Sequence, residues 1–248
     1  MLRTLSGRGL GRRILRGGVT LLVLAAALST PSLVLAQAAG QPFKIGIIGT
    51  GKIGSSLARY WVASGHEVFV SSRHPEELQG LVAELGPRAH AGTPREAAAF
   101  GSVILISIPY AAMPQIGQDL RSELAGKVIV DTSNPVERRD GPMALAIQQK
   151  GAGLATAELL HNPRVVRAFN CIAAAVLATQ ANRKPERIAI PIGGDDAQAL
   201  RIAAALVREA GFEPVLVGSL AQTREFDLGQ PLARGDLTAS ELRAKLTP

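Results

Sequence analysis

Three glycines within six positions, directly after a short apolar run, constrain the fold of this chain more than any other feature. Gly49, Gly51 and Gly54 form the pattern G-x-G-x-x-G between the apolar residues 44–48 and an amphipathic stretch that begins near Ile53. In a strand-turn-helix unit this pattern allows a sharp turn, a close approach of a pyrophosphate to the backbone and tight packing of helix on sheet. The alternative is a purely structural turn. The position at a strand-to-helix junction favours a dinucleotide site.

From Phe43 onward, short β-branched runs alternate with helical patterns, which is typical of βαβ units around a parallel sheet. We expect strands at residues 44–48, 66–71, 88–91, 102–108, 128–131, 165–169, 187–192 and 214–217. Helices are expected at 53–64, 75–85, directly after the cap residue Thr93, and at 111–124, 142–150, 154–160, 173–179, 196–210 and 239–245. The predicted fold class is α/β: a Rossmann-type, doubly wound, mainly parallel sheet with a small C-terminal αβ extension.

Residues 1–38 are interpreted as an export signal. They hold five arginines and no acidic residue, then an apolar stretch at 19–28 and a run of small residues, so cleavage after Ala36 or after Ala38 fits. Arg12 and Arg13 resemble the twin-arginine signal. An uncleaved anchor is an alternative, although a span needs about 20 apolar residues, and a wrongly assigned start codon is another. We therefore expect an exported, periplasmic protein of bacterial type, in which residues 39–248 form one dinucleotide-binding domain with the extension from about residue 153.

The charge balance argues against a polyanionic partner. The chain has 27 basic and 20 acidic residues, a net charge of +7, but five of the basic residues lie in the leader, which leaves 22 against 20. We expect no nucleic-acid partner and no stable membrane span after cleavage of the leader. Cys171 is the only cysteine, which excludes an intramolecular disulfide. The four histidines have no metal-ligand spacing, and we expect no metal site.

The end of the second expected strand indicates which dinucleotide is bound. A carboxylate there would hydrogen-bond the ribose hydroxyls of NAD, but the sequence reads "FVSSRHPEEL". Ser71 and Ser72 are neutral donors, and Arg73 offers a guanidinium that suits a phosphate. These residues favour NADP over NAD. The alternative for Arg73 is a solvated loop arginine.

At the end of the fourth strand, "ILISIPYAAM" places Ile108 and Pro109 where the chain leaves the sheet, beside the expected crevice. Pro109 alone is equally consistent with a strand terminator. Asn134 and Asn170 are candidates for orienting a carboxamide or an acceptor ring, and the alternative is that both make local hydrogen bonds at strand ends. Cys171, next to Asn170, is interpreted as a small buried hydrophobe rather than a redox group.

The ordered motifs "GTGKIGSSLA", "VSSRHP", "LISIPY", "VIVDTSNP" and "RVVRAFNCI" resemble the NADP-dependent reductases of the deazaflavin coenzyme F420. They are also similar to the NADPH-binding domain of six-transmembrane ferric reductases. The resemblance runs from about Lys44 to Val217. It implies an NADP(H) site in which the pyrophosphate is held by Thr50, Gly51, Lys52 and Ile53, and the 2′-phosphate by Ser72 and Arg73. The nicotinamide end would be lined by Ile108, Pro109, Ser133, Asn134, Pro135, Ala168, Phe169 and Asn170.

The chemistry that this resemblance implies is hydride exchange between NADP(H) and a flavin-like or deazaflavin acceptor, which needs orientation more than acid-base groups. The sequence has no Tyr-x-x-x-Lys pattern and no evident general acid, so no catalytic residue is assigned. Two alternatives remain: a non-catalytic NADP-binding module, and a small relative of the imine or hydroxyacid dehydrogenases. The latter need a large helical domain, and only 31 residues follow Val217. The expected partner is a small ring-type electron acceptor, and a homodimer is a candidate assembly.

Overall fold

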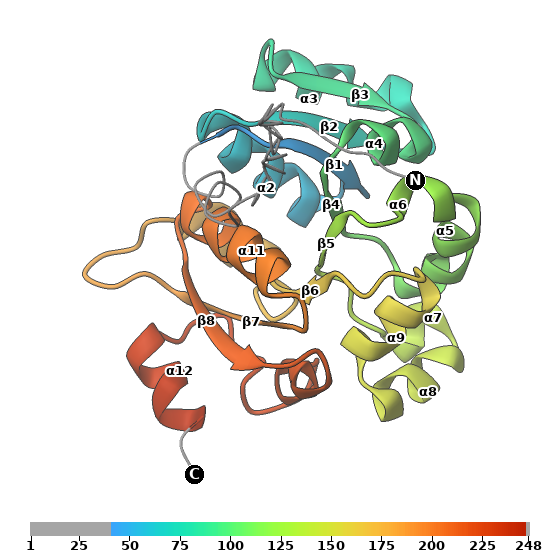
Figure 1. The fold of residues 1–248 in the computed structure, drawn as a ribbon. Helices are drawn as coiled ribbons and strands as arrows, with labels where there is room; N and C mark the ends of the chain where they lie inside the picture. The colour runs from blue at the N-terminus through green and yellow to red at the C-terminus, as the bar shows by residue number, and fades with distance from the viewer. Residues whose placement is uncertain (1–40, 247–248) are drawn as a thin grey trace, which may run out of the picture.

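The computed structural model describes residues 41–246, which form one eight-stranded sheet in the order β3-β2-β1-β4-β5-β6-β7-β8 (Figure 1). Neighbouring strands are parallel except β6 and β7, which are antiparallel. The prediction of a Rossmann-type, mainly parallel sheet is confirmed, while the division at about residue 153 stays a prediction. The strands are β1 (Lys44–Ile48), β2 (Glu67–Ser71), β3 (Ala89–Gly92), β4 (Val103–Ile106), β5 (Val128–Asp131), β6 (Val165–Arg167), β7 (Ala189–Gly194) and β8 (Glu213–Gly218).

Helices cover both faces of the sheet (Figure 1), so that the strands β4, β5, β6 and β7 are buried on two sides, while the edge strands β3 and β8 are partly exposed. The α-helices are α2 (Lys52–Ala63), α3 (Gln79–Leu85), α4 (Pro94–Phe100), α5 (Met113–Asp119), α6 (Arg121–Leu124), α7 (Glu137–Asp140), α8 (Met143–Lys150), α9 (Ala152–Leu159), α10 (Ala174–Thr179), α11 (Ala197–Glu209) and α12 (Ala239–Leu246). The short 3-10 helices of the described residues are η2 (Pro75–Leu78), η3 (Tyr110–Ala112) and η4 (Ala221–Phe226).

Hydrophobic cores lie on both faces of the sheet, because strand residues point alternately to each side. One core packs Ile45 and Ile47 of β1 against Trp61 of α2 and Leu206 of α11. Trp61 is fully buried, and its indole Nε1 donates to the Leu206 carbonyl at 3.0 Å, which joins the two helices. The other core packs the opposite strand residues, such as Ile104, against α4, α5 and α9. This packing fixes the strand ends where the site forms.

The start of α4 follows the sequence prediction. Thr93 accepts a hydrogen bond from the Glu96 backbone, the Glu96 carboxylate accepts from the Thr93 backbone at 2.8 Å, and Pro94 occupies the first turn. This capping box satisfies two backbone donors that a helix start leaves free.

The helix expected at 111–124 is interrupted. It consists of η3, α5 and α6, with Leu120 outside the α region at φ −110° and ψ 17°. The Asp119 carbonyl at this break accepts a hydrogen bond from the Arg95 guanidinium at 2.6 Å. The long-range contact compensates for the bond that a continuous helix would have made. The helices α7 and η4 were not expected from the sequence.

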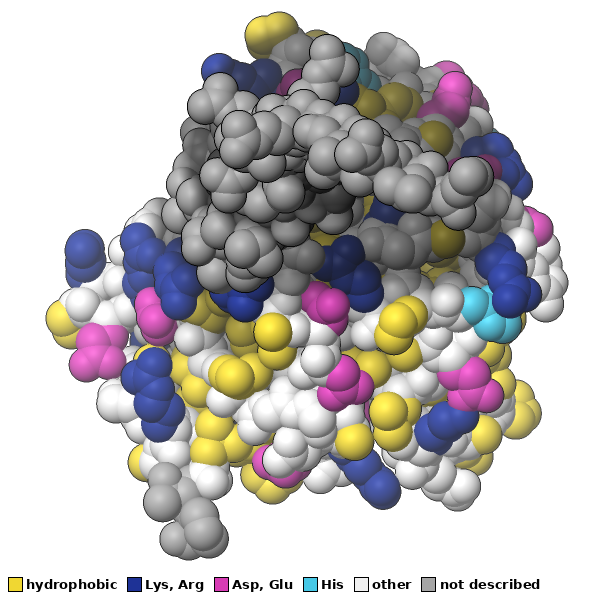
Figure 2. Space-filling model, viewed as in Figure 1, with side chains coloured by type: hydrophobic (Ala, Val, Ile, Leu, Met, Phe, Trp, Pro, Cys, Tyr) yellow, Lys and Arg dark blue, Asp and Glu magenta, His cyan; other side chains and the backbone are white. Residues whose placement is uncertain are grey.

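The expected leader, residues 1–38, lies outside the described residues. Between residues 41 and 246, no helix combines the length and the apolar character that crossing a membrane requires. On the face seen in Figure 2, basic and acidic side chains are interspersed among apolar and neutral ones. This distribution agrees with the near balance of charges outside the leader.

Candidate functional site

The glycine loop between β1 and α2 is held in a narrow turn. Gly49 has φ +98°, and a Cβ there would lie 2.2 Å from the Ser107 carbonyl oxygen. A Cβ on Gly54 would lie 2.3 Å from the Gly49 carbonyl oxygen, so this glycine allows α2 to start close to the strand. Both positions therefore require glycine for the packing of the protein itself.

Gly51 differs from its two neighbours in the motif. A Cβ built on Gly51 meets no atom within 4 Å, and its backbone at φ −78° and ψ −166° is extended. No steric contact within the described protein therefore requires glycine at this position. The N–H groups of the first turn of α2 follow directly, and the helix dipole gives this end a partial positive charge. The loop thus leaves open space beside donors that suit an anion.

Thr50 and Ser71 join the loop to the end of β2. The Thr50 hydroxyl donates to the Ser71 carbonyl at 2.9 Å and accepts from the Ser71 N–H at 3.1 Å. The Ser71 hydroxyl donates to the Ile47 carbonyl at 2.7 Å and is buried. The two hydroxyls expected near a ligand thus stabilise the loop, which leaves Ser72 and Arg73 as the available side chains at this strand end.

A cavity of 630 Å³ lies at the ends of β1 and β2, and we call it the β2-end cavity. Arg73 is exposed at its edge, and the part of the chain that the structure describes gives its guanidinium no ion pair or hydrogen bond. The cavity is lined by Ile48, Gly49, Thr50, Gly51, Ser71, Ser72, Arg73, Pro94, Ser107, Ile108, Pro109, Ala111, Ala112 and Ile116.

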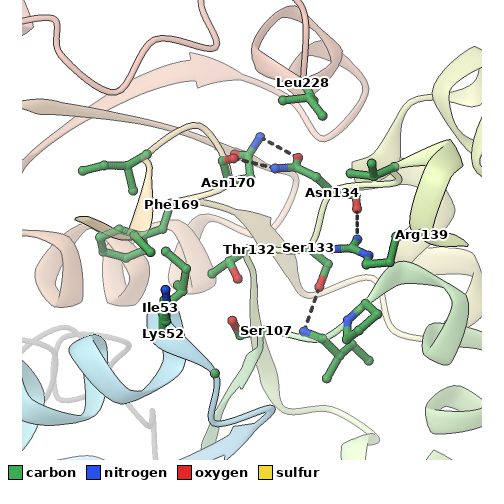
Figure 3. A pocket seen from close by; sticks show the side chains of 16 residues that line it. Lys52, Ile53, Ser107, Thr132, Ser133, Asn134, Arg139, Phe169, Asn170 and Leu228 are labelled. Atoms are coloured by element: carbon green, nitrogen blue, oxygen red, sulfur yellow. Dashed lines mark hydrogen bonds between the residues drawn. The ribbon is translucent and has the colours of Figure 1, made fainter. Parts of the chain in front are cut away.

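A second cavity, of 430 Å³, lies at the ends of β4, β5 and β6 (Figure 3), and we call it the β5-end cavity. It shares Gly51, Ser107, Ile108 and Pro109 with the first, so the two form one crevice that passes over the glycine loop. Its remaining lining residues are Lys52, Ile53, Thr132, Ser133, Asn134, Val136, Arg139, Phe169, Asn170, Ile172, Ala174 and Leu228.

Asn134 and Asn170 meet at the wall of the β5-end cavity (Figure 3). The Asn134 side-chain amide donates to the Asn170 carbonyl at 2.6 Å. The Asn170 amide nitrogen donates to the Phe226 carbonyl at 2.8 Å and to Asn134 Oδ1 at 3.5 Å. Asn170 Oδ1 is buried and has no partner among the described residues. A buried acceptor without a donor costs free energy, so a ligand that donates a hydrogen bond fits here.

A buried polar network lies directly behind this wall. Asp131, at the end of β5, accepts from the Ser133 N–H at 2.9 Å and from the Thr156 hydroxyl at 2.8 Å. It also pairs with Arg167 of β6 at 2.9 Å, and both side chains are fully buried. The pKa of the nearby Tyr110 hydroxyl is raised, by burial first and by Asp131 second. The network joins β5, β6, η3 and α9.

The ionisable side chains that line the β5-end cavity, within residues 41–246, are Lys52 and Arg139. Arg139 donates to the buried Asp140 at 2.8 Å and to the Asn134 carbonyl at 2.6 Å. No carboxylate, histidine, tyrosine or cysteine belongs to this described lining. Within this described lining, the cavity therefore offers hydrogen bonds and apolar contacts, with Lys52 as the one acid-base side chain of the kinds that usually transfer protons in catalysis.

The structure brings together most of the residues that the sequence singled out. Twelve of the fifteen candidates line the crevice: Gly49, Thr50, Gly51, Lys52, Ile53, Ser71, Ser72, Arg73, Ile108, Pro109, Asn134 and Asn170. The other three do not. Gly54 is a packing residue, Pro135 borders a separate cavity of 90 Å³, and Ala168 is fully buried, with its N–H bonded to the Asp131 carbonyl.

Several lining residues were missed in the candidate set. Ser107 and Thr132 follow directly after β4 and β5, so the rule that ligands bind at the carboxyl ends of parallel strands points to them. Arg139 and Leu228 gave no local signal, because only the fold brings the helix α7 and the segment after η4 to the cavity. Cys171 is partly buried outside the lining, and burial raises the pKa of its thiol to about 12.

Comparison with known proteins supports the resemblance expected from the motifs. Residues 44–135 match the family model described as NADP oxidoreductase, coenzyme F420-dependent. The chain is 34% identical over 196 residues to metalloreductase STEAP3 of Rattus norvegicus, a match that covers 78% of this chain and 37% of that protein. It is 28% identical over 203 residues to the F420-dependent NADP reductase of Methanothermobacter thermautotrophicus, covering 76% of this chain and 87% of the reductase.

Among solved structures, a hypothetical protein from Sinorhizobium meliloti shares the fold with a TM-score of 0.68 and 27% identity, covering 84% of this chain and 98% of that one. This chain spans 35% to 37% of the length of the metalloreductases that it matches. It spans most of the length of the reductase from Methanothermobacter thermautotrophicus.

Proposed function

We propose that this chain, whose residues 44–135 match the family model of coenzyme F420-dependent NADP oxidoreductases, binds NADP(H) and transfers a hydride between it and a flavin-like or deazaflavin acceptor. The observation that carries the proposal is the continuous crevice over Gly51, with an arginine at one end and an amide oxygen at the other that both lack a partner within the described part of the chain. The arginine suits the 2′-phosphate, the space at Gly51 suits the pyrophosphate, and the amide oxygen suits the nicotinamide carboxamide.

The space at Gly51 and the first turn of α2 fit the pyrophosphate. The space beside Gly51 holds no atom of the described protein within 4 Å of a Cβ built there. A side chain at this position would fill that space, which the anion needs. Backbone N–H groups of Lys52 and Ile53 would donate to the phosphate oxygens, and the partial positive charge of the helix end would stabilise them.

Arg73 and Ser72 fit the 2′-phosphate. Both line the β2-end cavity. Because no carboxylate among the described residues pairs with the Arg73 guanidinium, no ion pair has to break before it binds a phosphate. A guanidinium can donate two parallel hydrogen bonds to a phosphate. NADP(H) is therefore preferred over NAD(H), which lacks this phosphate.

The β5-end cavity fits the nicotinamide and the ring that exchanges hydride with it. We assign Asn170 Oδ1, a buried acceptor without a partner among the described residues, as the acceptor for the carboxamide N–H, and Asn134 holds Asn170 through its carbonyl. Bound NADPH supplies the hydride, and an acceptor ring receives it. The chain's own residues orient the two partners and exclude water, for which no acid-base side chain is needed.

Calorimetry with Arg73→Ala tests the cofactor assignment. Loss of a charge-assisted, two-bond contact costs about 1.5–3 kcal/mol, so the Kd for NADPH should rise roughly 10- to 100-fold while that for NADH stays the same. Arg88→Ala is the matched control, because Arg88 is an exposed arginine before β3, at the opposite end of the strands. Equal losses for both nucleotides would remove the assignment of Arg73.

Stopped-flow absorbance tests the hydride transfer. We expect the nicotinamide band of bound NADPH to disappear when a flavin or deazaflavin is added. A protein that binds NADPH but leaves every such acceptor unreduced would instead be the non-catalytic module. An imine or hydroxyacid substrate needs a proton donor, a role that falls to Lys52 in the described cavity lining, so turnover of such a substrate that is lost in Lys52→Met would favour that alternative.

The cellular setting is a further part of this proposal. We infer export of the chain through the leader at 1–38 to the periplasm, where a homodimer is the assembly to test. Fractionation of producing cells with N-terminal sequencing should find a mature form that starts after Ala36 or Ala38, and light scattering should give its mass. Full-length protein confined to the cytoplasm would contradict export.

A further inference from the structure

Arg167 is a fully buried arginine that does not line the crevice. It lies at the carboxyl end of β6, between the end of β5 and the segment after η4. Its Nη1 donates to Asp131 Oδ2 at 2.9 Å and to the Ser133 carbonyl. Its Nη2 donates to Asp227 Oδ1 at 2.9 Å and to Asn134 Oδ1 at 3.3 Å. One guanidinium thus joins two segments that are far apart in the sequence, residues 131–134 and Asp227, beside the β5-end cavity.

Stability alone does not explain this arrangement. Desolvating an arginine and two carboxylates is costly, and well-packed apolar residues often replace buried ion pairs without loss of stability. Burial would lower the pKa of Arg167, but Asp131 and Asp227 raise it, so the guanidinium remains charged. Its Nε also lacks a partner among residues 41–246, which adds to the cost. A buried charge with this cost suggests a role in geometry.

The contacts lead from Arg167 to the cavity wall in two steps. A guanidinium only donates hydrogen bonds, so Arg167 requires the oxygen of the Asn134 side chain to face it. The side-chain nitrogen of Asn134 then points away from Arg167 and donates to the Asn170 carbonyl at 2.6 Å (Figure 3). Because the Asn170 nitrogen donates to Asn134 and to Phe226, the atom that remains free is the acceptor Oδ1.

The same guanidinium also fixes the C-terminal side of the wall. Asp227 accepts from Arg167 with one oxygen and from the Ala152 N–H at the start of α9 with the other, at 2.9 Å. Phe226, the preceding residue, supplies the carbonyl that binds Asn170. Both partners of the Asn170 side-chain nitrogen are therefore held by contacts that include Arg167.

We propose that Arg167 is a positioning residue that acts through Asn134 and Asp227 to present Asn170 Oδ1 to the nicotinamide half of the ligand. This inference rests on the proposed function. It assigns Arg167 no contact with the ligand and no part in the adenosine half of the site.

The test compares two ligands by calorimetry: NADPH, and adenosine 2′,5′-bisphosphate, which lacks the nicotinamide half. Arg167→Lys keeps the positive charge but cannot reach all four acceptors. We expect its Kd for NADPH to rise about tenfold, the equivalent of one charge-assisted hydrogen bond, and its Kd for the fragment to stay within about twofold. A role only in folding would weaken both ligands together, and no change in either would equally overturn the proposal.

Arg164→Lys is the matched control. Arg164 precedes β6 at its other end and likewise bonds a backbone carbonyl, that of Gly126, and pairs with a carboxylate, that of Asp196 at 3.4 Å. Arg164→Lys should change neither the Kd for NADPH nor the Kd for the fragment. If Arg167→Lys does not fold, Asp227→Asn removes one carboxylate from the same guanidinium and carries the same expectation for the two ligands.

A double-mutant cycle tests whether Arg167 acts through Asn134. Asn134→Ala should weaken NADPH selectively, and adding Arg167→Lys to it should weaken NADPH less than Arg167→Lys does alone. Fully additive effects would mean that the two residues act separately. Wild-type protein that gives no heat with NADPH would instead end the proposed function, which is a different result from any of these.

Discussion

Replacing Gly51 by alanine should separate ligand binding from folding. The backbone of Gly51 is extended, a conformation that alanine adopts freely, and the new Cβ would meet no atom within 4 Å. Alanine lowers the entropy of the unfolded chain, which stabilises a protein by about 0.4–1 kcal/mol, but it is a poorer N-cap than glycine by a similar amount. We therefore expect the free energy of unfolding of ligand-free protein to change by less than about 1 kcal/mol.

The effect on binding should be much larger. The methyl group would occupy the space that we assign to the pyrophosphate and move the anion away from the N–H groups at the start of α2. Charge-assisted hydrogen bonds contribute about 1.5–3 kcal/mol each, so losing two of them raises the Kd for NADPH by roughly 100-fold or more. Thermal unfolding without ligand and calorimetry with NADPH measure the two effects separately.

Gly54→Ala is the contrasting variant, with the same chemical change three residues later. Its Cβ would lie 2.3 Å from the Gly49 carbonyl oxygen, a backbone atom of the loop, and overpacking of this kind costs typically about 1–3 kcal/mol. Its melting temperature should fall without ligand. Unchanged NADPH binding by Gly51→Ala, or a melting temperature as low as that of Gly54→Ala, would refute the reasoning.

Three further predictions concern stability and reactivity. Thr93→Ala removes the capping box of α4 and should lower the free energy of unfolding by about 1 kcal/mol in urea titrations; no change would show that the cap is dispensable. Burial would raise the pKa of Asp140, but hydrogen bonds from Arg139 and from two backbone N–H groups lower it below 3.8. This stabilisation is present above the pKa of the unfolded chain and is lost as pH falls through the lower pKa of the folded protein. The free energy of unfolding should therefore drop more steeply below about pH 4 in wild type than in Asp140→Asn, and parallel plots of that free energy against pH would contradict this. Burial raises the pKa of Cys171 to about 12, so iodoacetamide at neutral pH should alkylate native protein far more slowly than urea-unfolded protein, and equal rates would argue against a protected thiol.

The sheet could be predicted because local patterns determine it. Apolar runs mark the strands, and β1 at Lys44–Ile48 and β5 at Val128–Asp131 have the expected bounds. The direction of β7 relative to β6 could not be predicted, since parallel and antiparallel neighbours can carry the same apolar pattern. The break at Leu120 was missed for a similar reason, because the Arg95 contact that compensates for it is long-range.

The site was predictable where it follows from strand ends and glycine spacing, as at Gly51, Arg73 and Asn170. Its supporting network was not. In "RVVRAFNCI" Arg167 resembles an ordinary residue at a strand end, and its partner Asp227 lies 60 positions further along the chain. Pairings across such separations exist only once the fold has formed, so no local pattern indicates them.

The crevice has a practical consequence for engineering. Its two halves are built by different parts of the chain: β1, β2 and the loops beside them on one side, and β5, β6 and the segment around Leu228 on the other. Only the loop at Gly51 and the residues after β4 serve both. Under the proposed function, coenzyme preference would be changed at the end of β2 and acceptor choice at the opposite wall, as two separate design problems.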